Sequence, residues 1–296
     1  MTNALILRSP GKINFGLDII RKRPDGFHEL ESLMVPLDVC DEMVFESREA
    51  GHGVTMDCDV PDLPTDSGNL VIRAAELLRR HTDVTAGAHI KLRKRLPIAA
   101  GMGGGSGNGA VALTGLNQIW QLGLSREQLL PLAATLGSDC ALFLDPKPSF
   151  CHGRGERVEP LADAETRTLH AAHFVLINPG FGISTKWAYE QIGPFLTGRA
   201  GAIKVILNAL AAGDLPAAAR AMVNTLEGPA LRKFPLLGLL KESLARNGCV
   251  GAMMSGSGAT VFGVATDQAN AKRALAAARA EFGEKMWMTV AQAHAQ

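Results

Sequence analysis

The chain has 296 residues, of which 47% are hydrophobic, so it can bury a core large enough for two packed subdomains. Its 30 lysine and arginine residues balance 29 aspartate and glutamate residues, without a long basic run, which argues against a nucleic-acid-binding protein. The N-terminus has no hydrophobic signal core and no apolar stretch reaches the roughly 18 residues of a membrane span, so we expect a cytoplasmic protein that binds no membrane.

The cysteines argue against two kinds of structural site. They are odd in number and form no CxxC pair, which favours reduced, mostly buried thiols over a disulfide framework or a zinc site. The five positions are Cys40, Cys58, Cys140, Cys151 and Cys249. No metal ligand is identified from the sequence.

In the first half of the chain, short strands alternate with helices. Apolar runs on either side of residues 9–11 predict two strands joined by a turn, and PDGF at residues 24–27 predicts a further turn before the next strand. Helical spacing begins after Asn69, and the alternating residues 89–96 predict a strand that Pro97 ends.

A glycine segment, PIAAGMGGGSGNG at residues 97–109, separates that strand from a helix expected to reach about Leu122. A further helix is expected after Ser125, with Gln128 in the capping-box position. Glycine loses the most backbone entropy on folding, so a run of it beside a packed helix indicates that something approaches the backbone closely. Because a helix N-terminus offers amide donors and partial positive charge, a phosphate group suits this position.

Two familiar phosphate loops do not account for the glycine segment. A P-loop needs a lysine followed by serine or threonine after its second glycine, and the GxGxxG pattern fails because its last position falls on Ser106 or Asn108. A flexible surface linker is the alternative, and it would have polar flanks. The apolar residues Ile98 and Met102 and the apolar run from Ala110 favour a packed junction instead.

The second half of the chain begins near Cys151, so we divide the chain into residues 1–150 and 151–296. Glycines also separate two expected strands in AMMSGSGATVFGVA, residues 252–265. The remaining expected elements are a strand from His173, a short helix capped by Ser184 or Thr185, helices within 200–222 and 236–246, a helix over 268–282 and a strand over 287–293.

Three distant segments resemble, in order and spacing, the three motifs of the GHMP small-molecule kinases: SPGKINFGLDI at 9–19, LPIAAGMGGGSGNGA at 96–110 and MMSGSGATVFG at 253–263. Four more segments, DGFHELESLMVPLD, NLVIRAA, TLGSDCALFL and NPGFGISTKWAY, resemble the branch whose substrate is a methylerythritol carrying a CDP group. The resemblance covers nearly the whole chain. It implies an α+β GHMP kinase fold of two α/β-sandwich-like subdomains, with ATP bound by residues 1–150 and the active site in the cleft between the subdomains.

The resemblance also implies a reaction and its catalytic groups. ATP, with Mg²⁺, would donate its γ-phosphoryl group to the 2-hydroxyl of the CDP-bearing methylerythritol, in the non-mevalonate route to isoprenoid precursors. Lys12 and Asp139 match the catalytic positions. Asp139 would take the hydroxyl proton, and the Lys12 ammonium group would pair with Asp139 and steady the hydroxyl and the phosphoryl group.

Ligand-binding positions follow from the same resemblance. Those for ATP are Asn69, Lys94, Pro97, Gly101, Gly103, Gly104, Gly105, Ser106, Gly107 and Asn108, with Asn69 and Lys94 near the adenine. Those for the substrate are Asn14, Phe27, His28, Thr185 and Tyr189. Phe27 and Tyr189 would stack on the two faces of cytosine, and His28 would hydrogen-bond its edge.

The chain departs from the family pattern at several of these positions. Cys140 and Ala141 replace a Val-Pro pair after Asp139, so the backbone that aims the carboxylate has lost a rigid residue. Gly107 stands where a second serine is expected, which would remove a hydroxyl contact to phosphate or magnesium. Gly11 replaces an alanine, and Phe27 replaces a tyrosine.

Two alternative functions remain open at this point. A GHMP kinase of the homoserine or mevalonate type would share the three motifs but would not need DGFH together with Tyr189. A non-catalytic nucleotide-binding relative would be indicated by loss of Lys12 or Asp139, and both are present. In either case we expect small-molecule ligands and a monomer or weak homodimer.

Overall fold

The computed structural model describes residues 4–196 and 201–295. The chain forms two compact units whose segments alternate along the sequence. Unit 1 comprises Met1–Gly11, Val39–Leu96 and Gly103–Pro146, and unit 2 comprises Lys12–Asp38, Pro97–Met102 and Lys147–Gln296. Each unit therefore combines residues that are far apart in the sequence. The division of the chain at residue 150, with ATP bound by residues 1–150, stays a prediction.

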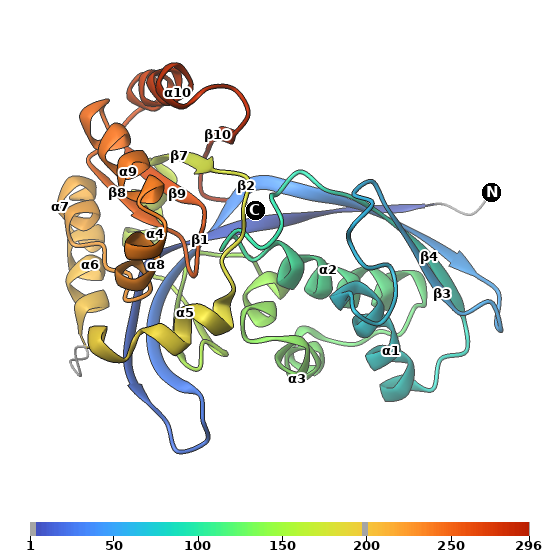
Figure 1. Cartoon of the computed structure of the whole chain (residues 1–296). Coiled ribbons are helices and arrows are strands. Elements are labelled where there is room, and N and C mark those ends of the chain that lie inside the picture. The colour runs from blue at the N-terminus through green and yellow to red at the C-terminus, as the bar shows by residue number, and fades with distance from the viewer. Residues whose placement is uncertain (1–3, 197–200, 296) are drawn as a thin grey trace. The chain divides into compact units, whose positions relative to one another are not determined.

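Unit 1 is a layer of strands covered by helices. Its elements are β3 (Val54–Cys58), α1 (Leu70–Thr82), β4 (Gly87–Arg93), α2 (Gly104–Ile119), α3 (Arg126–Leu136) and the 3₁₀ helix η1 (Ser138–Leu144), with the adjoining parts of β1 (Leu5–Lys22) and β2 (His28–Arg48). β3 and β4 are parallel, and β4 pairs antiparallel with residues 42–48 of β2. Figure 1 shows α1, α2 and α3 on one side of β3 and β4.

Glycines bring α2 close to its neighbours in unit 1. A Cβ atom at Gly109 would lie 3.1 Å from Cβ of Leu70 on α1, and one at Gly115 would lie 2.7 Å from the ring of Phe45 on β2. On the same helix, the side chains of Leu113 and Leu116 are fully buried. Close packing therefore accounts for part of the glycine content of this helix.

Unit 2 contains a second, antiparallel sheet in the order β10-β7-β9-β8. Its strands are β7 (His173–Asn178), β8 (Gly251–Met254), β9 (Val261–Ala265) and β10 (Trp287–Ala291), while β5 (Ser149–Gly153) pairs with residues 30–34 of β2 and with β6 (Arg157–Pro160). Its helices are α4 (Asp163–His170), α5 (Thr185–Gln191), η2 (Gly193–Phe195), α6 (Ala202–Ala211), α7 (Leu215–Arg220), α8 (Glu227–Lys233), α9 (Leu236–Arg246) and α10 (Gln268–Phe282). Leucines of α9 and alanines of α10 belong to one buried hydrophobic cluster with residues of β7, β8 and β9. Figure 1 shows where these helices and strands lie in the chain.

Most expected elements are confirmed. The structure has the Ser125–Gln128 capping box, places the cap of α5 at Ser184, and gives α10 the bounds expected from the sequence. The expected helical region 200–222 divides into α6 and α7, and its first residue, Ala200, lies outside the described residues. In the described part of the chain, every helix is too short or too polar to cross a membrane.

One expectation about the N-terminal half is wrong, and one expected helix ends slightly earlier than predicted. Residues 9–11 form no turn, because β1 runs unbroken from Leu5 to Lys22. Among the named strands of the described residues, β1 pairs with β2, so its other edge at Pro10 does not need the missing N–H. The helix expected to reach Leu122 ends at Ile119 and begins at Gly104, inside the glycine run.

Candidate active site

The ammonium group of Lys12 lies in a network of oxygen atoms within unit 2. Lys12 is 4% exposed, and its Nζ donates hydrogen bonds to Oδ1 of Asn14 at 2.5 Å and to the carbonyl oxygen of Gly101 at 3.1 Å. Alternate residues of a strand share a face, which places Lys12 and Asn14 together. Ser255 Oγ donates to the same Gly101 oxygen at 2.9 Å. Buried charge needs such acceptors, so the position of the ammonium group is tightly defined.

The third-motif turn, residues 254–258, forms one wall around Lys12. Gly256 has a φ of +55°, and a Cβ atom there would lie 3.0 Å from Asn14 Oδ1 and 3.5 Å from Lys12 Nζ. A side chain at Gly101 would collide with the carbonyl oxygen of Ser255. Gly101 is therefore required by close approach of backbone to backbone, and Gly256 by its positive φ and its closeness to the side chain of Asn14.

The N-terminus of α2 has the features expected of a phosphate site. Gly103 precedes it in the left-handed conformation, with φ of +68°, and offers no side chain to cap the first amide groups. Gly105 is exposed, and a Cβ atom there would meet nothing within 4 Å. Ser106 completes this first turn with a half-buried hydroxyl. An anion can therefore reach backbone donors here without displacing side chains.

Gly107, the position where a second serine was expected, faces β1. A Cβ atom at this position would lie 2.9 Å from Oγ of Ser9 and 3.0 Å from the carbonyl oxygen of Pro10. A serine would crowd both groups. Close approach of α2 to β1 thus accounts for the departure from the family pattern.

Behind the first turn of α2, the expected ATP-binding residues Lys94 and Asn108 form a buried polar cluster with Asp41 and Ser9, which sequence reasoning missed. Lys94 Nζ pairs with Oδ2 of Asp41 and donates to Oδ1 of Asn108 at 3.3 Å, and Asn108 Nδ2 donates to Asp41 at 3.0 Å and to Ser9 Oγ at 2.9 Å. Asp41 is fully buried. The cluster fixes the start of α2 and places positive charge 3.3 Å from where a Cβ of Gly104 would be.

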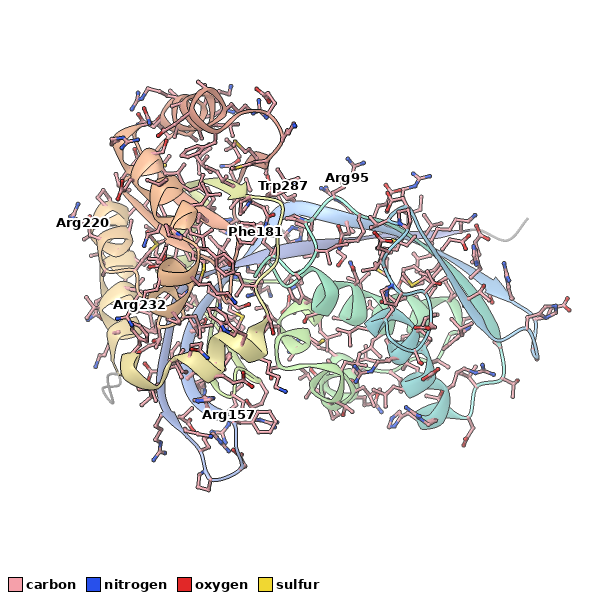
Figure 2. The ribbon with its side chains drawn as sticks, in the orientation of Figure 1. Arg95, Arg157, Phe181, Arg220, Arg232 and Trp287 are labelled. Atoms are coloured by element: carbon pink, nitrogen blue, oxygen red, sulfur yellow. The ribbon has the colours of Figure 1, made fainter. Side chains whose placement is uncertain are left out.

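Asp41 also organises the backbone between β4 and the glycine segment. Its Oδ1 accepts hydrogen bonds from the amides of Arg95 and Leu96 at 2.8 and 2.9 Å. The side chain of Arg95 points outward in Figure 2. The sequence did carry a usable pattern, since Asp41 alternates with the core residues Met43 and Phe45 and so occupies an inward position.

Asp139 lies in the first turn of η1 and is half-buried. The next residue, Cys140, is fully buried, and burial raises the pKa of its thiol to about 12, with a hydrogen bond from Ser106 opposing the rise. The thiol therefore stays protonated and does not compete with Asp139 as a base. The Cys140 amide donates to the Gly137 carbonyl at 3.1 Å, so the 3₁₀ turn constrains the Asp139 backbone in place of the missing proline.

The residues expected to bind cytosine form two ring contacts in unit 2. The rings of His28 and Tyr189 lie 5.1 Å apart between centroids. Burial, and secondarily the charge of Lys22, lowers the pKa of His28. Phe27 is 53% exposed, and the guanidinium group of Arg154 lies 4.7 Å above its ring. Arg154 was missed, because no local pattern connects the turn after β5 with Phe27.

Two other expected ligand residues have hydrogen-bond partners in the structure. The Thr185 and Ser257 hydroxyl oxygens are 3.0 Å apart, which connects α5 to the third-motif turn. Asn69 caps α1 by accepting from the Val71 amide at 3.0 Å, and it donates to the Pro64 carbonyl at 2.8 Å. Pro97 is half-buried at the start of the 97–102 segment. Their ligand contacts stay predictions, as does the pairing of Lys12 with Asp139.

The donor groups of the chain bear on how it could hold a metal ion. Residues 4–196 and 201–295 contain no group of three or more histidine, cysteine, aspartate or glutamate side chains that could hold a metal ion. All five cysteines are free thiols. Mg²⁺ bound together with substrate phosphates needs only one or two oxygen ligands from the protein, and the Ser106 hydroxyl on the first turn of α2 is suited to that use.

Comparison with known proteins agrees with the motifs. Residues 69–145 match the family model described as GHMP kinases N terminal domain, and residues 206–284 match that described as GHMP kinases C terminal. The chain is 40% identical over 265 residues to a 4-diphosphocytidyl-2-C-methyl-D-erythritol kinase of Pelotomaculum thermopropionicum, with 90% of each chain covered.

Solved structures give the same result at the level of the fold. A crystal structure of 4-(cytidine 5'-diphospho)-2C-methyl-D-erythritol kinase is 33% identical, with a TM-score of 0.80 over 98% of this chain and 100% of that chain. A homoserine kinase from Cytophaga hutchinsonii has a TM-score of 0.75 at 20% identity, covering 99% of this chain and 95% of that one. At that identity the likeness concerns the fold alone.

Proposed function

This chain belongs to the GHMP kinases and, within them, to the 4-diphosphocytidyl-2-C-methyl-D-erythritol kinase family, and from this membership we propose the reaction it catalyses. It is an ATP-dependent small-molecule kinase that phosphorylates the 2-hydroxyl of 4-diphosphocytidyl-2-C-methyl-D-erythritol, in the non-mevalonate route to isoprenoid precursors. The observation that carries the assignment at the site is the buried Lys12 ammonium group, whose acceptors come from the first two motifs and are held by the third.

The proposed chemistry assigns separate roles to Asp139 and Lys12. The carboxylate of Asp139 takes the proton of the 2-hydroxyl, the hydroxyl oxygen bonds to the γ-phosphorus, and the bond to the bridging oxygen breaks as ADP leaves. The carbon that bears this hydroxyl also carries a methyl group, so the nucleophile is crowded and depends on orientation. Lys12 provides that orientation and compensates negative charge on the transferring group.

The phosphates of ATP are assigned to the first turn of α2, within residues 1–150. Support comes from the uncapped amide groups after Gly103, the open side of Gly105 and the Lys94 charge behind the turn. We assign the hydroxyl of Ser106 as a ligand of Mg²⁺. Bound with the phosphates, Mg²⁺ would supply charge neutralisation for the transferring phosphoryl group.

The CDP group is assigned to the ring contacts of unit 2. Tyr189 and Phe27 offer faces for stacking on cytosine, and His28 offers a hydrogen-bonding nitrogen beside Tyr189. Asn14 and Thr185 are assigned to the methylerythritol portion or its phosphates. This recognition distinguishes the proposed substrate from homoserine and mevalonate, which carry no base.

The position of the new phosphate tests the proposed reaction. The protein is incubated with ATP, Mg²⁺ and 4-diphosphocytidyl-2-C-methyl-D-erythritol, and the product is examined by proton-coupled ³¹P NMR. Carbon 2 bears no hydrogen, so a phosphomonoester there gives a resonance without three-bond coupling to a proton on the ester carbon. A resonance split by such protons, or no new phosphomonoester, contradicts the proposal.

A further inference from the structure

Asn224, which none of the motifs includes, holds the third-motif turn by its side chain. Its Nδ2 donates hydrogen bonds to the carbonyl oxygens of Met254 and Gly256, both at 2.8 Å. Its Oδ1 accepts from the Leu226 amide at 2.9 Å, just before α8. The side chain is 7% exposed, so these hydrogen bonds are largely shielded from water.

The backbone around Asn224 is attached to the strand that carries Lys12. The Leu17 amide on β1 donates to the carbonyl oxygen of Val223 at 2.7 Å, and the Thr225 amide donates back to the Leu17 carbonyl at 3.0 Å. Leu17 and Asn224 thus form a parallel bridge. Asn224 and its two flanking residues therefore connect β1 with the third-motif turn through four hydrogen bonds, two from the Asn224 side chain and two from the flanking backbone.

Glu227 holds the same turn through a different atom. Its Oε1 accepts from the Met254 amide at 2.7 Å, and its Oε2 pairs with Lys241 at 2.7 Å. Asn224 and Glu227 thus occupy both the carbonyl and the amide of Met254. Of these two side chains, only that of Asn224 donates a hydrogen bond to the Gly256 carbonyl. Gly256 is also the residue that lies against Asn14 and Lys12.

We propose that Asn224 is a positioning residue for phosphoryl transfer: by holding Gly256 at a fixed distance from β1, it sets the space in which the Lys12 ammonium group sits. If the turn moved away from β1, Ser255 would release the Gly101 carbonyl, which is one of the acceptors of Lys12. Misplacement of a charged group by about 1 Å can cost on the order of 100-fold in rate. The expected effect of Asn224 on turnover rests on the proposed function.

Two substitutions separate this role from that of the hydrogen bond to the Leu226 amide, just before α8. Asn224→Asp keeps an oxygen that accepts from the Leu226 amide but loses both donors to the third-motif turn, whereas Asn224→Ala loses all three bonds. We expect both variants to lower kcat by about tenfold or more, with KM for ATP within about twofold of the wild type. If Asn224 acts only through its hydrogen bond to the Leu226 amide, Asn224→Asp retains wild-type kcat.

Thr225→Val is the matched control. Its hydroxyl accepts from the Ile19 amide at 3.0 Å and is 3.4 Å from Asp18 Oδ1, so it anchors the same segment to β1 without touching the third-motif turn. We expect Thr225→Val to lower Tm while its kcat stays within about twofold of the wild type. All variants are assayed at a temperature where circular dichroism shows them folded.

Hydrogen exchange gives a readout that needs no turnover. In the wild type, the Ser255 amide donates to the Thr260 carbonyl and the Gly258 amide donates to the Ser255 carbonyl, both at 2.9 Å. We expect a peptide spanning residues 251–262 to exchange faster in Asn224→Asp than in the wild type or Thr225→Val. If the wild type did not phosphorylate the substrate, the proposed function would be contradicted. The exchange difference would still appear, because it does not depend on turnover.

The proposal is overturned if folded Asn224→Asp shows wild-type kcat, or if its exchange over residues 251–262 matches that of the wild type. It is also overturned if neither Asn224 variant folds at any assay temperature, because Asn224 would then serve the stability of the unit rather than the placement of Lys12.

Discussion

The ammonium group of Lys12 donates a hydrogen bond of 2.5 Å to the side-chain oxygen of Asn14, and both side chains are buried. Asn14 is held in turn, since its Nδ2 donates to Ser32 Oγ and its amide donates to Ser255 Oγ. A lysine on a flexible stem thereby becomes a charge of defined position. Catalysis by charge stabilisation depends on such preorganisation.

Replacement of Lys12 by methionine and of Asp139 by asparagine should each lower kcat by about 100-fold or more, with little change in ATP affinity. Both groups are assigned to the transition state, so their loss removes little ground-state binding. Steady-state kinetics and calorimetric titration of ATP provide the two measurements. Lys91→Met, at an exposed lysine of β4 paired with Glu46, is the control. Near-normal turnover in either variant removes that residue from the mechanism.

Gly105→Val tests the phosphate assignment more directly than a change at Gly104, where a side chain would approach Lys94. The valine has open space, so the fold should persist, but it would occupy the approach of the phosphate. We expect ATP to bind at least about fivefold more weakly. Gly238→Val on α9 is matched, since a Cβ there also meets nothing within 4 Å. Equal ATP affinity in Gly105→Val and Gly238→Val would favour a flexible surface linker over a phosphate site for the glycine segment.

The stacking assignment predicts that Tyr189→Ala and Phe27→Ala each weaken CDP binding by roughly 5- to 150-fold, because base stacking contributes about 1–3 kcal/mol. ATP affinity should hardly change. Phe27→Tyr should be tolerated, since Phe27 is 53% exposed and a hydroxyl finds room. Titration of CDP on an Asp139→Asn background isolates binding from turnover. Unchanged CDP affinity in both alanine variants would rule out the base sandwich.

The lowered pKa of His28 predicts a dependence of substrate KM on pH. Burial and the Lys22 charge move this pKa below its ordinary value of 6.5, so the imidazole is neutral at pH 7 and gains a proton only at pH values below 6.5. A neutral ring nitrogen can accept a hydrogen bond from the cytosine amino group, and a protonated one cannot.

Accordingly, KM for the substrate should stay constant between about pH 8 and pH 7 and rise as the pH falls below 6.5. His28→Gln keeps an acceptor without a titrating group, so its KM should lack this rise. KM for ATP, measured in parallel, serves as the control. A wild-type profile that coincides with that of His28→Gln would show that His28 does not read the base.

Elements with local causes could be predicted from the sequence. The capping box at Ser125 and Gln128 and the helix that follows Asp267 depend on residues three or four positions apart. The unbroken β1 could not, because Ser9–Gly11 is a turn sequence by local rules. There, pairing with β2 and the close approach of α2 at Gly107 override the local preference.

The site was predicted only where a motif marks it. Lys12, Asn14 and Thr185 lie in recognisable segments, and the structure connects them with Gly101, Ser255 and Ser257. Neither Asp41 nor Asn224 lies in such a segment. The side-chain partners of Asp41 lie 53 to 67 residues away, and those of Asn224 in the third-motif turn lie 30 to 32 residues away. Their roles depend on which backbone groups the fold brings to them, which spacing along the chain does not reveal.

The most direct test of the assigned activity is a comparison of kcat/KM for three acceptors with the unmodified protein and MgATP, followed by ADP release. We expect 4-diphosphocytidyl-2-C-methyl-D-erythritol to exceed both mevalonate and homoserine by about 100-fold or more, because only this acceptor presents a base to Phe27, His28 and Tyr189. A higher kcat/KM for mevalonate or homoserine, or ADP release that depends on none of the three, would contradict it.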